Sequence, residues 1–134
     1  GWARVPGTEA SGANGIEVSR DGKWIYLSAW GSQSYLRLSR GISPAQRQEV
    51  RLDFRPDNFH WAPDGMLLGA GQTEADGTRV VKIDPDTLEV TLLLDKPATA
   101  HFFRGTAAIE VDGEIWVGAS RIEHIAIFSA TAAR

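Results

Sequence analysis

The chain has no cysteine among its 134 residues, so disulfides and thiolate metal sites are excluded and the redox compartment is left open. No apolar run approaches the ~20 residues of a membrane-spanning helix, and no segment has a convincing helical period. The 14 basic residues form no cluster and are outnumbered by 17 acidic ones, which argues against nucleic acid as a partner. We expect a soluble protein; periplasmic, secreted and cytoplasmic locations all remain open.

Short strand patterns separated by turn signals fill the chain instead. Asp-Gly pairs stand at 21–22, 64–65 and 112–113, each between two short apolar segments. Glycine supplies the positive φ that tight hairpin turns need. The sequence therefore predicts an all-β protein. The expected strands are residues 15–19, 23–29, 34–39, 49–54, 59–61, 66–70, 79–84, 88–94, 107–111, 114–119 and 124–128.

The strand pattern repeats. Asn58 follows Asn14 by 44 residues, and the Asp-Gly pairs at 21–22, 64–65 and 112–113 are 43 and 48 residues apart. A repeat of about 40–50 residues built from short strands is typical of β-propeller blades. We expect about three four-stranded blades. Their bounds are residues 12–54, 55–104 and 105–134, with residues 1–6 as a strand that closes a preceding blade.

Three blades make an open arc, and each end of such an arc presents uncovered or unpaired sheet. Two explanations follow. Either the chain is half of a longer six-bladed protein whose N-terminal half is missing here, or two copies associate as a homodimer into a six-bladed ring. The sequence leaves both open.

Polar side chains stand at equivalent places just before the first strand of two blades. These are Asn14 in the first blade and Asp57 and Asn58 in the second. In a propeller such positions gather around the central axis, so the repeat predicts a polar, oxygen-rich site. An ordinary turn interpretation also fits, because Asn-Gly and Pro-Asp-Asn are turn sequences.

Residues 12–22 (GANGIEVSRDG), 55–58 (RPDN) and 105–108 (GTAA) resemble the C-terminal half of six-bladed propeller hydrolases. These are the SMP-30/gluconolactonase/strictosidine synthase-like proteins and, above all, the paraoxonase-type arylesterases. The resemblance covers nearly the whole chain. It implies a hydrolase of lactones or aryl esters with a calcium ion (Ca2+) at the bottom of a central pocket. The family's further Glu and Asn ligands come from its N-terminal half and have no counterpart here.

The resemblance assigns Asn14, Asp57 and Asn58 as calcium ligands. Calcium prefers six to eight oxygens, so the others must come from water, substrate, the missing half or a second copy. In the implied reaction the ion polarises the carbonyl of the lactone or ester, and Asp57 is the catalytic candidate that accepts a proton from water. No Gly-x-Ser-x-Gly motif indicates a serine nucleophile.

Further candidates lie at one rim of the expected blades. Trp30, Gln72 and Ser120 each follow the second strand of a blade, Arg121 adjoins Ser120, and His101 lies in the loop before the third blade. We expect these five residues to line the substrate pocket, although Trp30 also fits a core position and Arg121 a solvated charge. Gln72 stands where some relatives of the resembled family carry a pocket histidine, which argues against a histidine-assisted mechanism.

Three residues inside strand patterns are ambiguous. His60 fits either a pocket wall or a position packed between blades. Glu17 and Glu110 occupy matching Ile-Glu-Val segments, and a charge repeated in this way is expected to contact the neighbouring blade.

Two functions compete. One is part of a calcium-dependent lactonase or arylesterase acting on a small-molecule lactone or ester. The alternative is a non-catalytic half-propeller module that self-assembles into a six-bladed ring for binding.

Overall fold

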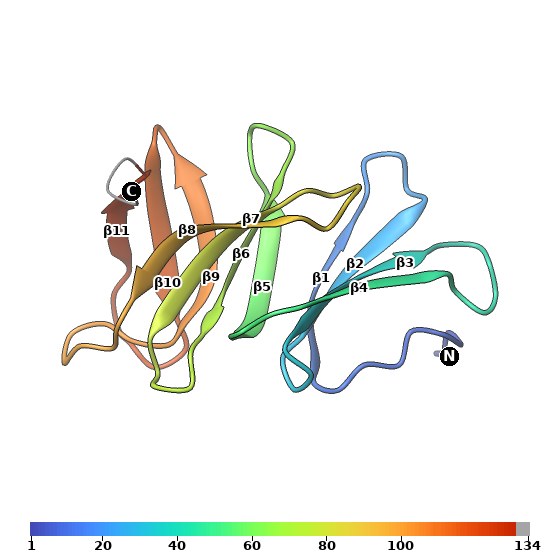
Figure 1. Ribbon diagram of the computed structural model, residues 1–134, viewed down its shortest axis with the longest axis horizontal. Helices are drawn as coiled ribbons and strands as arrows, with labels where there is room; N and C mark the ends of the chain where they lie inside the picture. Colours follow the sequence, from blue (N-terminus) through green and yellow to red (C-terminus); the bar gives the residue numbers. More distant parts are fainter. Residues whose placement is uncertain (131–134) are drawn as a thin grey trace.

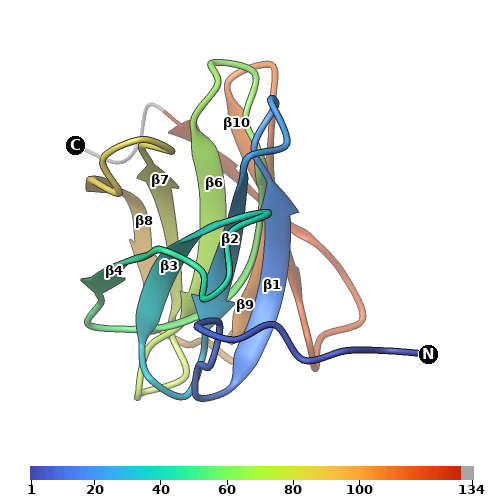
Figure 2. The same ribbon diagram turned by 90° about the vertical axis from the view of Figure 1, so that its right-hand side faces the viewer.

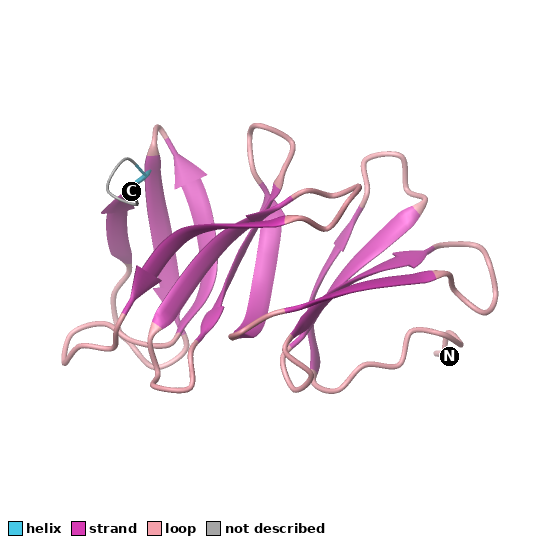
Figure 3. Cartoon of the chain, in the orientation of Figure 1, coloured by secondary structure: helices cyan, strands magenta, loops and turns pink. Residues whose placement is uncertain are grey.

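The computed structural model describes residues 1–130, which form eleven antiparallel strands in three consecutive sheets (Figure 1). Blade 1 has the order β1-β2-β3-β4, blade 2 the order β5-β6-β7-β8, and blade 3 the order β11-β10-β9. The described residues contain no α-helix, and strands and loops make up nearly all of the chain in Figure 3. The all-β propeller architecture predicted from the repeat is confirmed.

The strand bounds follow the hairpin plan. Blade 1 comprises β1 (Ala13–Val18), β2 (Trp24–Ala29), β3 (Ser34–Ser39) and β4 (Arg47–Arg51). Blade 2 comprises β5 (Arg55–Trp61), β6 (Leu67–Gln72), β7 (Thr78–Ile83) and β8 (Val90–Lys96). Blade 3 comprises β9 (Gly105–Val111), β10 (Glu114–Ala119) and β11 (Ala126–Ser129).

The first strand of each blade faces the same side of the arc. β5 contacts both β1 and β9, so these three inner strands are neighbours across the blades (Figure 1). The outer strands β4 and β8 lie on the opposite side (Figure 2). Because inner strands line the axis of a propeller, side chains from β1, β5 and β9 can meet in one site.

The core consists of apolar layers between adjacent blades. All six residues of β6 are buried, because blade 2 is covered on both of its faces. Leu67 packs toward blade 1 with Tyr35 and Phe59, whereas Leu68 packs toward blade 3 with Val117. Alternation along β6 therefore sends successive side chains into two different apolar layers, which explains why its sequence is apolar from Leu67 to Gly71.

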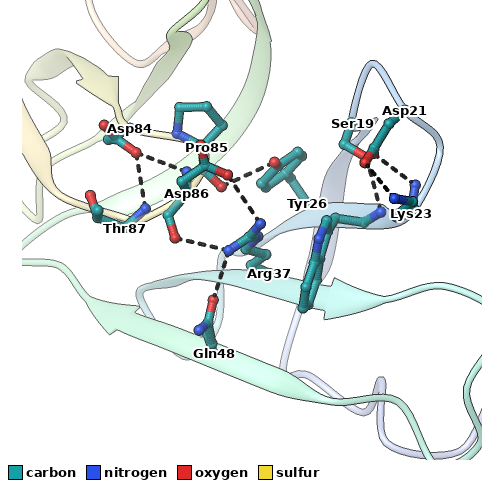
Figure 4. Close-up of polar contacts among 11 residues, drawn as sticks. Ser19, Asp21, Lys23, Tyr26, Arg37, Gln48, Asp84, Pro85, Asp86 and Thr87 are labelled. Carbon is teal, nitrogen blue, oxygen red and sulfur yellow. Dashed lines mark hydrogen bonds and ion pairs between the residues drawn. The ribbon is translucent and has the colours of Figure 1, made fainter.

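Polar contacts also join blades 1 and 2 on the outer side (Figure 4). The mostly buried guanidinium of Arg37 donates to the backbone oxygen of Asp86 at 2.8 Å and to its carboxylate at 3.1 Å. The Tyr26 hydroxyl donates to the Pro85 oxygen at 3.0 Å. These bonds hold the turn between β7 and β8 against blade 1.

The matching glutamates contact the neighbouring blade, as their repeat predicted. Glu17 lies 3.8 Å from Nδ1 of His60 on β5, and Glu110 pairs with Lys82 on β7 at 2.9 Å. The His60 side chain is exposed and contacts Glu17 of blade 1, so it is not packed in a buried layer between the blades.

One local prediction needs correction. Asn14, Asp57 and Asn58 lie inside β1 and β5 rather than before them, because both strands begin earlier and contain bulges. Residues 1–6 pair with no strand of the described chain, and their role in closing a preceding blade stays a prediction. That segment meets a loop of blade 1, where the Ala45 N–H donates to the Pro6 oxygen at 3.0 Å, and this contact does not extend into a strand ladder.

Both ends of the arc expose apolar side chains. Ile16 is 66% exposed on blade 1, and Ile109 and Ile127 are 50% and 52% exposed on blade 3. A groove of about 500 Å³ runs over the blade 1 face beside Ile16. Nothing in residues 1–130 forms a helix with the length and apolar character to cross a bilayer.

Candidate functional site

Bulges in the inner strands position the site. The pairing of β1 with β2 passes from Ala13 directly to Ile16, and that of β5 with β6 passes from Pro56 directly to Phe59. Asn14-Gly15 and Asp57-Asn58 therefore each lie opposite a single residue of the next strand, and they form two equivalent bulges. A bulge redirects side chains that regular alternation would send elsewhere. The repeat noticed in the sequence thus corresponds to a repeated bulge.

The third inner strand has an irregularity at the same level. The pairing of β9 with β10 skips Thr106. The backbone oxygen of Thr106 accepts a hydrogen bond of 3.2 Å from the Asn58 amide of the adjacent blade. All three blades therefore contribute to one polar cluster beside the inner strands.

Gly15 and Ser28 bring the first two bulges together. A Cβ on Gly15 would lie 2.5 Å from the Asp57 backbone oxygen and 2.8 Å from Cα of Asn58. The fully buried Ser28 hydroxyl accepts from the Gly15 N–H at 2.7 Å and donates to the Asp57 backbone oxygen. Only a residue without a side chain fits this approach, so Gly15 and Ser28 set the spacing between blades 1 and 2.

The Asp57 carboxylate is the centre of the cluster. Its Oδ1 accepts from the Asn58 amide at 2.8 Å and its Oδ2 from the Gln72 amide at 2.9 Å. The Asn14 side chain also favours the charge on this carboxylate. Three carboxamides from two blades therefore act on one carboxylate, and we call Asn14, Asp57, Asn58 and Gln72 the Asp57 cluster.

Trp30 fixes the orientation of Gln72. The indole Nε1 donates to Oε1 of Gln72 at 3.0 Å, and Gln72 is only 4% exposed. An indole N–H can only donate. The amide oxygen of Gln72 must therefore face Trp30, which turns its NH₂ group toward Asp57.

Burial raises the pKa of the Asp57 carboxyl above its ordinary value, and the hydrogen bonds from Gln72 and Asn14 partly offset that effect. The low-dielectric surroundings disfavour the charge, while the amide donors favour it. A raised pKa makes the ionised carboxyl a stronger base than that of an ordinary aspartate.

A cation lies next to the cluster. The Arg55 guanidinium stacks over the Trp30 ring, with Cζ 4.6 Å from the ring centroid. Arg55 is partly buried at the start of β5, where its backbone pairs with Gln72. Arg55, Trp30, Gln72 and Asp57 thus form a continuous row of contacts.

The structure brings together only some of the predicted pocket residues. Trp30 and Gln72 join the Asp57 cluster directly. Ser120 and Arg121 follow β10 and are exposed, and His101 is exposed in the loop between β8 and β9. Within residues 1–130, the side chains of these last three residues form no hydrogen bond or ion pair with the Asp57 cluster, so their role as pocket residues stays a prediction.

The hydrogen bonds of the Asp57 cluster bear on the calcium prediction. Both oxygens of Asp57 accept N–H groups, and the Asn58 NH₂ faces two acceptors, Asp57 and the Thr106 oxygen. The cluster therefore lines its carboxylate with nitrogen donors rather than with the oxygens that calcium prefers. In the described part of the chain, no three His, Asp or Glu side chains gather where they could hold a metal ion. A calcium ion at Asp57 would have to displace the amides of Asn58 and Gln72 from the carboxylate, and calcium binding here stays a prediction.

Three participants were missed by the sequence reasoning. Ser28 ends an apolar strand pattern as an ordinary polar residue, and only its complete burial marks it. Thr106 accepts the Asn58 hydrogen bond with its backbone oxygen, so its residue type does not indicate this role. Arg55 could have been noticed as a basic residue two positions before Asp57.

Comparison with known proteins shows which family the chain belongs to. A family model described as lactonase, seven-bladed β-propeller, matches residues 3–102. Its seven blades differ from the six of the hydrolases that the sequence resembles, so the match supports a lactonase-type propeller but not that particular group. No curated protein matches the chain.

Two solved structures share the fold. A putative 6-phosphogluconolactonase from Bacteroides fragilis NCTC 9343 has 21% identity and a TM-score of 0.62, and the match covers 96% of this chain and 36% of that one. Hydrazine synthase from Kuenenia stuttgartiensis has 18% identity and a TM-score of 0.63, and the match covers 98% of this chain and 36% of that one. This chain thus spans about a third of their length.

At these identities the structural likeness shows the fold alone, and the two printed names describe different chemistries, so fold by itself does not carry function. The family model covers most of the chain and is more specific. The chain belongs to the lactonase family of seven-bladed β-propellers.

Proposed function

We propose that this chain contributes the Asp57 cluster to a site that hydrolyses lactones. The observation that carries the proposal is the partly buried Asp57 carboxyl, with its raised pKa, held by carboxamides at the inner strands of a lactonase-family propeller. The family supports lactone hydrolysis in general, and the cluster supplies a group with suitable chemistry.

In this proposal Asp57 is the general base. Its carboxylate accepts a proton from a water molecule as the water oxygen attacks the lactone carbonyl carbon. The ring C–O bond then breaks, and the proton passes from Asp57 to the departing alkoxide. The product is the hydroxy acid, and lactone and water are consumed in equal amounts. Gln72 and Asn58 keep the carboxylate oriented through their amide bonds.

Calcium dependence is a further part of the proposal. The ligands would be Asn14, Asp57 and Asn58, as the sequence resemblance implies, with other oxygens from outside the described residues. The hydrogen bonds of the cluster argue against it, because the Asn58 and Gln72 amides would have to leave Asp57. Calorimetric titration with calcium tests this point: binding that is lost in Asn58→Ala would support it, and no binding would remove it.

The substrate class is proposed more finely as sugar lactones, with aryl esters as the second class. A fold neighbour whose name contains 6-phosphogluconolactonase supports the first class.

The chain is also proposed to associate with further blades or with a second copy, since both ends of the arc expose isoleucines. Two copies would supply six blades, one fewer than the family has. Native mass spectrometry reports the copy number.

A panel of sugar lactones and aryl esters, assayed with and without chelator, tests the function. Lactone opening above the rate in buffer supports the proposal, and loss of activity with chelator would add the metal. Turnover of no compound in either condition would favour the alternative, a non-catalytic propeller module used for binding.

A further inference from the structure

We propose that Arg55, held against Trp30, binds an oxyanion of the ligand, a carboxylate or a phosphate, at the edge of the Asp57 cluster. That the ligand is the substrate of the enzyme rests on the proposed function. The binding itself is argued from the contacts of Arg55.

Stacking leaves the donors of Arg55 available. Cζ of the Arg55 guanidinium lies over the Trp30 ring, 4.6 Å from the ring centroid. The five N–H donors of a guanidinium point outward in its plane, away from a stacked ring. Among residues 1–130, no side chain or backbone oxygen forms a recorded hydrogen bond or ion pair with the Arg55 guanidinium. The ring therefore holds the charge in place while its donating edge stays accessible.

The same chain shows how such an arrangement binds a carboxylate. Arg37 stacks over Trp24, with Cζ 4.0 Å from the ring centroid. Its N–H edge meanwhile donates to the Asp86 carboxylate at 3.1 Å and the Asp86 backbone oxygen at 2.8 Å (Figure 4). A stacked arginine with an oxyanion at its edge is thus a stable arrangement in this fold. Arg55 on Trp30 repeats the stack beside the Asp57 cluster.

The position of Arg55 connects it with the reacting groups. Trp30 bonds Gln72 at 3.0 Å, and Gln72 bonds Asp57 at 2.9 Å. Asp57 itself forms no ion pair with Arg55 within 4.0 Å in the described residues, and its amide donors supply its hydrogen bonds instead. Arg55 therefore keeps a positive charge that can offset the Asp57 charge when an anionic ligand approaches.

The test follows the indole N–H signals in two-dimensional ¹H–¹⁵N NMR of the whole chain, which contains five tryptophans. The Trp30 signal is assigned by its loss in Trp30→Phe. Glucose 6-phosphate, gluconate and glucose are titrated at constant ionic strength. We expect the Trp30 signal to move with at least one of the two anions, at an affinity about tenfold or more above that for glucose, since charge-assisted hydrogen bonds distinguish the ligands. The two anions distinguish a phosphate ligand from a carboxylate ligand.

Arg55→Gln is expected to reduce the anion affinity to that for glucose. Arg20→Gln is the matched control, because Arg20 also stacks on a tryptophan, 5.6 Å from the Trp61 ring, at the other end of β5. We expect it to bind as the wild type does. Undiminished anion binding by Arg55→Gln would overturn the inference.

A wild-type Trp30 signal that responds equally to all three compounds, or to none, would also overturn it, and this comparison needs no variant. Neither result depends on turnover. Lactone opening without anion binding would leave the proposed function standing, and anion binding without lactone opening would leave the Arg55 site standing.

Discussion

The indole N–H of Trp30 donates to the amide oxygen of Gln72 at 3.0 Å and thereby decides which end of that amide meets the Asp57 carboxylate. Trp30 follows β2 in blade 1, and Gln72 ends β6 in blade 2. A contact between β2 of blade 1 and β6 of blade 2 therefore sets the hydrogen bonding of the Asp57 carboxyl, which lies on β5. Trp30 is in this sense a positioning residue for Asp57.

Replacing Trp30 by Phe removes the donor and allows the Gln72 amide to turn. Because Asp57 would lose a fixed N–H donor that favours its charge, we expect the pKa of Asp57 to rise further. The measurement is the titration of the Asp57 carboxyl by ¹³C NMR. Trp116→Phe is the control, since the Trp116 indole bonds Glu114 within blade 3, away from the cluster. An Asp57 titration that is identical in wild type and Trp30→Phe would show that Trp30 does not act through Gln72.

Ser28→Ala tests the connection between the first two bulges. The substitution leaves the Gly15 N–H and the Asp57 backbone oxygen without their partner in a fully buried place. We expect the free energy of unfolding to fall by about 1–3 kcal/mol, measured by urea denaturation. Thr91→Ala on the exposed side of β8 should change it by less than about 0.5 kcal/mol. Equal stability of the two variants would mean that Ser28 does not hold the blades together.

Gly15→Ala tests the close approach of β1 to β5. The new Cβ would lie 2.5 Å from the Asp57 backbone oxygen, so one of the two bulges must move. We expect a loss of about 1–3 kcal/mol in the free energy of unfolding and a shift in the Asp57 carboxyl signal. Gly118→Ala is the matched control, because a Cβ there meets no atom within 4 Å. A Gly15→Ala protein as stable as Gly118→Ala would contradict the geometry.

The raised pKa of Asp57 has a defined consequence for stability. The folded state binds the proton more tightly than the unfolded state, so the contribution is present at low pH and is lost as pH rises through the folded pKa. Asp57→Asn removes this dependence. As pH falls from 7 into the acid range, we expect the wild type to gain stability relative to Asp57→Asn, measured by thermal unfolding at several pH values. A relative loss of wild-type stability on acidification would mean that the amide bonds outweigh burial.

The architecture could be predicted because its signals are local. Each Asp-Gly turn directly determines a hairpin, and the spacing of Asn14 and Asn58 reports a blade-sized repeat. The equivalence of strand ends also placed Trp30 and Gln72 at one rim, and the structure joins them with a hydrogen bond. Patterns that repeat from blade to blade were therefore reliable guides to position.

The rest depends on relationships between blades that no single segment contains. The register shifts that place Asn14 and Asp57 inside strands arise from pairing with β2 and β6. The Asn58 amide has its orientation set by Thr106 in another blade. Oxygen-bearing residue types predicted a cation site, which stays a prediction. The amides of Asn58 and Gln72 turn their nitrogens toward Asp57, and that direction cannot be known from residue type.

The most direct measurement of the central claim compares sugar lactone opening by the wild type and by Asp57→Asn at pH 7, with Asp112→Asn as the control. Asp112 is an exposed turn residue with a φ of 48°, which asparagine tolerates. If Asp57 is the general base, its loss should lower kcat by about 10²–10⁴-fold, while Asp112→Asn keeps the wild-type rate. Equal rates for wild type and Asp57→Asn, whether fast or at the level of buffer alone, would contradict the account.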